Sequence, residues 1–307
     1  MPVDYVIIQK EHSGQRLDNY LFKTLKGVPK SRIYRAIRGG EFRINKKRCK
    51  AETRLHTGDE LRIPPLRTAE ERSIPAVSSQ LQQLLESRIL IEDKDLILIN
   101  KPSGIPVHGG SNVSLGLIEA LRQLRPQCKF LELVHRLDRG TSGCMLIAKK
   151  RSVLTRLQQW LQSKEMKKRY WVLVKGQWEG DSKRCDLPLI KNQLQSGERI
   201  VKVSHQGKHA ITVFRPLQVF KDATLLEATL KTGRTHQIRV HLQSLGYPVA
   251  GDDKYGDREF NRLMRQRGLS RLFLQAVELA YRDHEYLFGA CALLDQELTQ
   301  VLDSSEY

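Results

Sequence analysis

One carboxylate in the middle of the chain has the neighbours that nucleophilic or general-base chemistry requires. Asp138 stands in the run His-Arg-Leu-Asp-Arg-Gly-Thr-Ser-Gly (residues 135–143), with Arg136 before it and Arg139 after it. A guanidinium close to a carboxylate keeps it charged, which suits a nucleophile or base better than a proton donor. The same pattern also occurs where an Arg–Asp pair only ties a surface loop together. The residues alone leave both interpretations open.

Two short apolar runs predict the elements that present this carboxylate. Residues 131–134 precede the run and residues 145–148 follow it, and both segments have the composition of buried strands. The polar stretch between them contains two glycines, a threonine and a serine, which favour a tight loop. We therefore expect Asp138 to lie on a loop between two strands.

The nine-residue run is similar to the signature of the RluA-type pseudouridine synthases, and the resemblance extends over nearly the whole chain. The segments Asn-Lys-Pro-Ser-Gly (100–104), Ile-Pro-Val-His-Gly-Gly (105–110), Arg-Tyr-Trp (169–171) and Gly-Arg-Thr-His-Gln-Ile-Arg-Val-His (233–241) follow in the family's order. The sequence resembles most the bacterial members that act on 23S ribosomal RNA. The resemblance implies an isomerase that needs no cofactor and no metal.

The resemblance also implies roles for four residues. Asp138 would attack C1′ of the target uridine or remove its 2′ proton, and the sequence leaves both routes open. Tyr170 would stack on the uracil ring and could help to remove the proton from C5. Arg234 would form an ion pair with Asp138, and Arg136 would enter the space that the flipped uridine vacates. Lys101 is expected to hold backbone and to take no part in the chemistry.

The first 66 residues carry a disproportionate share of the positive charge. They hold 15 lysines and arginines against 7 acidic residues. A predicted helix with a basic stripe and the hairpin after it provide Arg32, Arg35, Arg38, Lys46, Lys47 and Arg48. Alone, such a stripe is more often a solvated helix face. The helix and hairpin together resemble an S4 domain, which implies contacts with RNA phosphates that weaken with salt.

The order of predicted elements indicates three segments. Residues 1–66 form the S4-like domain, residues 67–85 a polar linker, and residues 86–307 the catalytic domain. The fold class expected for the whole is α+β, with a mixed, mostly antiparallel sheet in the catalytic domain. The linker contains prolines and serines and few apolar residues.

Composition limits the partners and the compartment. The 307 residues carry a net charge of +18, which favours a polyanion such as nucleic acid. No stretch approaches the roughly 20 apolar residues of a membrane span, and no signal peptide is apparent. Five cysteines without a C-x-x-C pair indicate reduced thiols in a cytoplasmic protein. No oligomer signal is present, so we expect a monomer.

Two other interpretations remain at this point. The same chemistry could act on uridines of other ribosomal or transfer RNAs. A protein of this fold could also be a non-catalytic RNA-binding or ribosome-assembly factor. The motifs do not identify the target uridines, because RNA is recognised largely through its shape.

Overall fold

The computed structural model consists of two units, residues 1–74 and 75–307, which we describe separately as the N-terminal and C-terminal units. The structure describes residues 3–25, 27–66, 75–109, 115–163, 166–193, 199–282 and 287–305. The predicted linker begins with residues 67–74, which lie outside the described residues.

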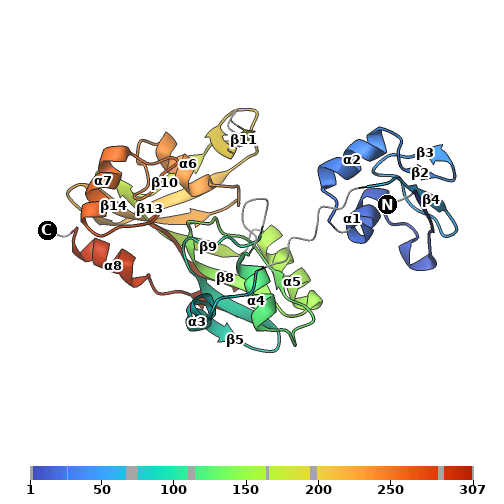
Figure 1. The fold of residues 1–307 in the computed structure, drawn as a ribbon. Coiled ribbons are helices and arrows are strands. Elements are labelled where there is room, and N and C mark those ends of the chain that lie inside the picture. Colours follow the sequence, from blue (N-terminus) through green and yellow to red (C-terminus); the bar gives the residue numbers. More distant parts are fainter. Residues whose placement is uncertain are drawn as a thin grey trace. The chain divides into compact units, whose positions relative to one another are not determined.

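The N-terminal unit is a small antiparallel sheet with two helices (Figure 1, blue). Its strands lie in the order β1 (Asp4–Ile7), β4 (Glu60–Ile63), β2 (Arg43–Ile44) and β3 (Lys47–Arg48). A 3₁₀ turn, η1 (Lys10–His12), precedes the helices α1 (Leu17–Thr24) and α2 (Lys30–Arg38). Helix α2 buries Ile33, Ala36 and Ile37 in the core of this unit, which leaves its arginines on the outer sides.

The basic hairpin turns through two residues in the left-handed region. Asn45 has φ 50° and Lys46 has φ 66°. Two such residues form the type I′ turn, whose twist matches that of the flanking strands. The side chain of Asn45 accepts from the Glu60 N–H at 2.9 Å and donates to Asp59 at 2.8 Å. These bonds fix the hairpin against β4.

A ten-stranded sheet forms the centre of the C-terminal unit (Figure 1). Its main path is β10-β13-β14-β9-β15-β8-β6-β5, with β16 paired to β15 and β7 to β8. The strands are β5 (Ile89–Glu92), β6 (Leu96–Lys101), β7 (Glu132–Leu133), β8 (Ser142–Ala148), β9 (Lys167–Lys175), β10 (Lys183–Asp186), β13 (Ile211–Val219), β14 (Ala223–Leu230), β15 (Leu274–Arg282) and β16 (Leu287–Cys291). Among the described strands only β8 and β15 pair in parallel. The predicted α+β fold with a mixed, mostly antiparallel sheet is confirmed.

Helices cover both faces of this sheet, and the alternation along each strand decides what each face contains. In β6, Ile97 and Ile99 face the core that includes α3 (Ser79–Ser87), α4 (Leu117–Leu124) and α6 (Gln237–Ser244). Leu98 between them faces the core of α5 (Arg151–Gln162). In β9, Leu173 contacts the core of α7 (Arg258–Gln266) and α8 (Gln296–Asp303). A separate two-stranded sheet, β11 (Leu189–Gln193) and β12 (Arg199–Val203), packs on α6.

The second part of the predicted linker belongs to the C-terminal unit. Helix α3 begins after Ser78, whose hydroxyl accepts from the Leu81 N–H at 3.2 Å. Leu85 is fully buried, and Val77 and Leu81 pack against the same core. The prediction of a linker as far as residue 85 was therefore wrong over residues 75–85. Only three of the nine residues of α3 are apolar, Leu81, Leu84 and Leu85, so the composition of the segment resembles that of a linker.

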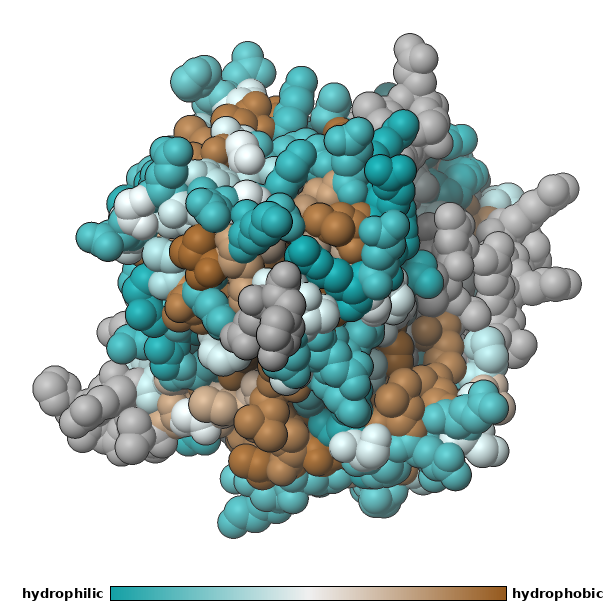
Figure 2. All heavy atoms as spheres, turned by 90° about the vertical axis from the view of Figure 1, so that its left-hand side faces the viewer, coloured by the Kyte–Doolittle hydropathy of each residue, from teal (hydrophilic) through white to brown (hydrophobic). Residues whose placement is uncertain are grey.

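Hydrophilic residues dominate the face of the molecule shown in Figure 2, with apolar residues in separate patches between them. The fully or largely exposed apolar side chains include Leu293 and Val219. In the part of the chain that the structure describes, no helix has both the length and the apolar character needed to cross a bilayer.

Candidate active site

Asp138 lies on the loop between β7 and β8, as the sequence predicts, and its side chain is 21% exposed. The Thr141 N–H donates to the Asp138 carbonyl at 3.1 Å and closes the turn. Gly143 follows with φ 111°, and a Cβ there would lie 2.1 Å from the Ala276 carbonyl oxygen. The glycine of the motif therefore lets β8 approach β15 closely directly after the loop.

The loop after β6 supports the Asp138 loop through hydrogen bonds to its backbone. Lys101 is fully buried, and its Nζ donates to the carbonyls of Pro102 and Ile105 at 2.8 Å and of Arg139 at 3.2 Å. Ser103 Oγ donates to the Gly140 carbonyl at 2.7 Å. Burial lowers the pKa of Lys101 to about 7, whereas the three carbonyl acceptors favour its charged form. The lysine holds backbone, as expected.

Asp138 and Tyr170 line one cleft of about 450 Å³ on the α6 side of the sheet. Tyr170 is buried in β9 between Ala228 of β14 and Ala276 of β15. Burial first, and the negative charge of Asp138 second, raise the pKa of the Tyr170 hydroxyl, so it stays protonated. Arg136, exposed, also lines this cleft.

The expected ion pair between Arg234 and Asp138 is not the contact found in the structure. Arg234 lines the cleft, but it is exposed and its Nε donates to the His209 carbonyl at 3.1 Å. Arg239 NH1 lies 3.8 Å from Asp138 Oδ2 instead. Arg234 precedes α6, whereas Arg239 projects from its first turn, which faces the cleft. Sequence reasoning missed Arg239, although it stands in the same motif.

One further group, His236, approaches Asp138. Nε2 of His236 also lies 3.8 Å from Asp138 Oδ2. Arg239 is held by two 2.7 Å bonds to Asp252, whose side chain is completely buried. Burial lowers the pKa of His236, so the imidazole is neutral at neutral pH. The carboxylate thus faces one fixed cation and one neutral ring.

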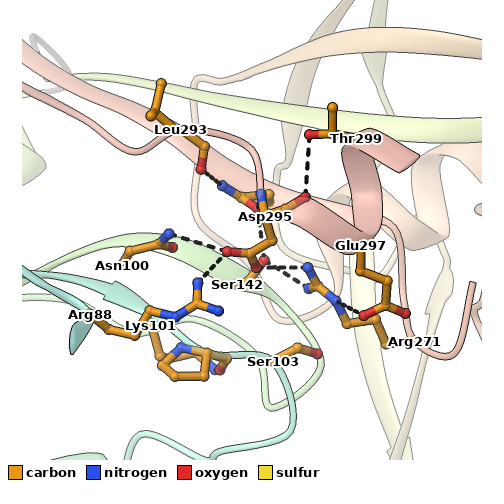
Figure 3. Close-up of polar contacts among 12 residues, drawn as sticks. Arg88, Asn100, Lys101, Ser103, Ser142, Arg271, Leu293, Asp295, Glu297 and Thr299 are labelled. Carbon is orange, nitrogen blue, oxygen red and sulfur yellow. Dashed lines mark hydrogen bonds and ion pairs between the residues drawn. The ribbon is translucent and has the colours of Figure 1, made fainter. Parts of the chain in front are cut away.

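A polar network around Asp295 lies next to the start of β8 (Figure 3). Asp295 accepts from Arg88, from Asn100 at 3.2 Å and from Arg271 at 2.7 Å. Arg271 also donates to Ser142 Oγ at 3.0 Å. Ser142 begins β8 and directly follows the Asp138 loop. The network therefore connects α3, β6 and the residue before α8 to the start of this strand.

The six basic residues expected to bind RNA lie on the N-terminal unit, and the structure distinguishes one of them. Arg35, Arg38, Lys46, Lys47 and Arg48 are exposed. Arg32 is half-buried and forms a two-pronged ion pair with Glu41, at 2.9 and 2.8 Å. The Glu41 carboxylate partly neutralises Arg32, whereas the other five form no ion pair within the part of the chain that the structure describes.

The described residues provide no cluster of three or more His, Cys, Asp or Glu side chains suited to a metal ion. His205 and His209, which stand at metal-like spacing in the sequence, lie near β11 and β12. There His209 pairs with Asp186 at 3.2 Å.

Comparison with known proteins identifies both units. The model of the RNA pseudouridylate synthase family matches residues 95–244, and that of the S4 domain matches residues 15–61. The ribosomal large subunit pseudouridine synthase C of Haemophilus influenzae is 54% identical over 281 residues, covering 91% of this chain and 87% of that protein. The enzyme of the same name from Escherichia coli K12 is 54% identical over 283 residues, covering 91% and 88%.

A solved structure agrees with these relationships. Human RNA pseudouridylate synthase domain containing 4 superposes with a TM-score of 0.60 at 27% identity, over 73% of this chain and 95% of that one. The cleft with Asp138 and Tyr170 lies on strands and loops of the matched region. The chain belongs to the RNA pseudouridylate synthase family.

Proposed function

We propose that this pseudouridine synthase acts on uridines of large-subunit (23S) ribosomal RNA, with Asp138 as the group that reacts with the sugar. The observation that carries the proposal is the position of Asp138: it faces Tyr170 across one cleft, while Arg239 and His236 approach its Oδ2. Relatives that are 54% identical are named ribosomal large subunit pseudouridine synthases, which supports large-subunit RNA as the substrate.

The reaction breaks the N1–C1′ bond of uridine and forms a C5–C1′ bond. C5 loses a proton and N1 gains one, so substrate and product are isomers. Asp138 could attack C1′ to form an ester, or remove the 2′ proton to form a glycal. Because Oδ2 faces Arg239 and His236, we assign the reaction to Oδ1. Water must be kept from C1′ until the base returns, and a cleft filled by the nucleotide would do this.

Tyr170 would support the base through its ring. Its raised pKa keeps the hydroxyl protonated, so the ring is a neutral surface on which uracil can stack. Tyr170 is among the residues that line the cleft with Asp138. C5 must lose its proton after the new bond forms, and a contribution of Tyr170 to that step stays a prediction.

Arg136 would replace the flipped uridine in the RNA stack. Its side chain is exposed and lines the same cleft as Asp138, two residues away. Unstacking a base costs a few kcal/mol, and a planar guanidinium in the vacated space lowers that cost. Arg234, exposed at the rim, would contact the RNA backbone instead of Asp138.

The N-terminal unit would supply affinity through phosphates. We assign this to the five exposed basic residues, Arg35, Arg38, Lys46, Lys47 and Arg48, and a smaller share to the paired Arg32. Such contacts position RNA without reading its sequence. We also propose a cytoplasmic location, because the five cysteines are free thiols; the monomer stays a prediction.

The test is a map of pseudouridines in cells that lack the protein. Ribosomal and transfer RNA would be treated with carbodiimide, which labels pseudouridine, and the labelled sites would be read as stops of reverse transcription. The deletion cells would be compared with cells in which wild-type protein, Asp138→Asn or the control Asp303→Asn is restored. Asp303 is exposed at the end of α8. We expect stops in 23S RNA that vanish on deletion and return with wild type and the control only. Sites in other RNAs would favour a sister activity, and no change in any RNA would favour an assembly factor.

A further inference from the structure

His236 has a backbone conformation that its residue type rarely adopts. It lies directly before α6 with φ 54° and ψ 20°, in the left-handed region. A residue other than glycine is strained there and is often found at functional sites. This conformation directs the imidazole between two groups: Nε2 lies 3.8 Å from Asp138 Oδ2, and Nδ1 lies 2.8 Å from the Tyr255 hydroxyl.

The hydrogen bonds of Tyr255 determine which nitrogen of His236 carries the proton. Tyr255 is 3% exposed, and its oxygen accepts from the Val201 N–H of β12 at 2.9 Å. Its single proton is left for the imidazole, so the hydroxyl donates to Nδ1. A neutral imidazole that accepts at Nδ1 carries its proton on Nε2. That Nε2–H faces Asp138.

Arg239 and Asp252 are the charged groups next to the Tyr255 ring. Arg239 lies over the Tyr255 ring, 4.9 Å from its centroid, and is fixed by Asp252. His236 thus has charged neighbours of both signs: Asp138 and Asp252, and Arg239 and Lys254. These charges oppose one another, and burial keeps the ring neutral.

We infer that His236 is a positioning residue for Asp138: a neutral imidazole whose tautomer is set by Tyr255 and whose Nε2–H holds one oxygen of the carboxylate. The inference rests on the proposed role of Asp138. A gap of 3.8 Å is longer than a hydrogen bond, and a small rotation of the carboxylate closes it when substrate binds. A neutral donor orients the carboxylate without offering it the proton that an imidazolium would.

His241, in the same helix, shows what a purely structural histidine looks like here. It is completely buried, and both of its nitrogens have partners in the scaffold. Nδ1 lies 2.9 Å from Thr212 Oγ1, and Nε2 lies 3.0 Å from the Leu187 carbonyl. Nε2 of His236 points instead into the cleft toward the carboxylate.

The test combines a spectroscopic measurement with single-turnover kinetics. Proteins with ¹⁵N-labelled histidine would be examined by NMR without RNA, so the tautomer of His236 is measured independently of activity. We expect the Nε2–H tautomer in wild type and a mixture in Tyr255→Phe, while the His241 signal stays unchanged. An Nδ1–H tautomer in wild type would overturn the inference.

The kinetic arm uses an rRNA fragment at saturating enzyme, with RNA affinity measured separately. We expect His236→Asn, which tolerates the left-handed backbone, to lower the single-turnover rate about 10- to 100-fold with unchanged affinity. His236→Gln, whose amide nitrogen reaches the place of Nε2, should recover part of the loss. A wild-type rate in His236→Asn would refute the positioning role. A wild-type rate in Asp138→Asn would remove the proposed function itself, and with it this role.

Discussion

Replacement of Asp295 by alanine should destabilise the C-terminal unit by about 3 kcal/mol. The Asp295 side chain is 8% exposed and accepts from two guanidiniums and from Asn100. Breaking a buried ion pair on one side typically costs about 3–5 kcal/mol, because the remaining charge loses its partner. Arg271 keeps Glu297 and Ser142, and Arg88 is 31% exposed, so we expect the lower end of this range.

A thermal melt followed by circular dichroism, together with urea denaturation, measures this loss. For a unit of this size each kcal/mol shifts Tm by about 2–4 °C, so Asp295→Ala should melt about 6–12 °C below wild type. The matched control is Glu297→Gln, because Glu297 contacts the same Arg271 but is 33% exposed. The control should lose less than about 1 kcal/mol. A Tm of Asp295→Ala within about 2 °C of wild type would refute the reasoning, since the shift would then be below that of one kcal/mol.

Three further predictions concern the active site and the RNA contacts. Lys101→Met should lower stability by about 1–3 kcal/mol, because buried carbonyls lose their donor. The stability advantage of wild type should be larger at pH 9 than at pH 6, since the folded lysine has a pKa of about 7 and the unfolded chain keeps that proton to about pH 10.4. Urea titrations at both pH values would show it, and the opposite trend would contradict the lowered pKa. Arg136→Ala should slow turnover more on structured RNA than on a loose strand, and equal losses would argue against the flipping role. Arg38→Ala should reduce the slope of log affinity against log salt by about 1, and Arg32→Ala by less; filter binding at several salt concentrations compares them, and equal slopes would contradict the effect of Glu41.

Local patterns predicted that Asp138 lies on a loop between two apolar strands, and the structure has it there. The roles of Asp138 and of Tyr170, the fourth residue of β9, came from the resemblance to the family and not from the patterns alone. The pairing of Asp138 with Arg239 depends on how α6 meets the sheet. Arg234 and Arg239 stand five residues apart in one motif, and only the direction of the first turn of the helix separates their roles.

The same limit explains the error at the domain boundary. Helix α3 places Leu81 and Leu85 one turn apart against the C-terminal core, while its third leucine, Leu84, is exposed and its other residues are polar. Its burial arises from a surface provided by strands later in the chain, which local composition cannot indicate. The network around Asp295 was equally hidden, because its members lie up to 207 residues apart in the sequence.

The parallel pairing of β8 with β15 has a consequence for the order in which the protein forms during synthesis. Ser142 and Gly143 pair with Gln275 and Ala276. The strand after the Asp138 loop can therefore complete its pairing only when residues more than a hundred positions later have been synthesised. The sheet β1-β4-β2-β3 of the N-terminal unit is formed entirely by residues 4–63. At the usual elongation rates about 200 residues take about 10–40 s to add. A nascent chain would therefore display a folded RNA-binding unit for that interval while its catalytic cleft is still incomplete.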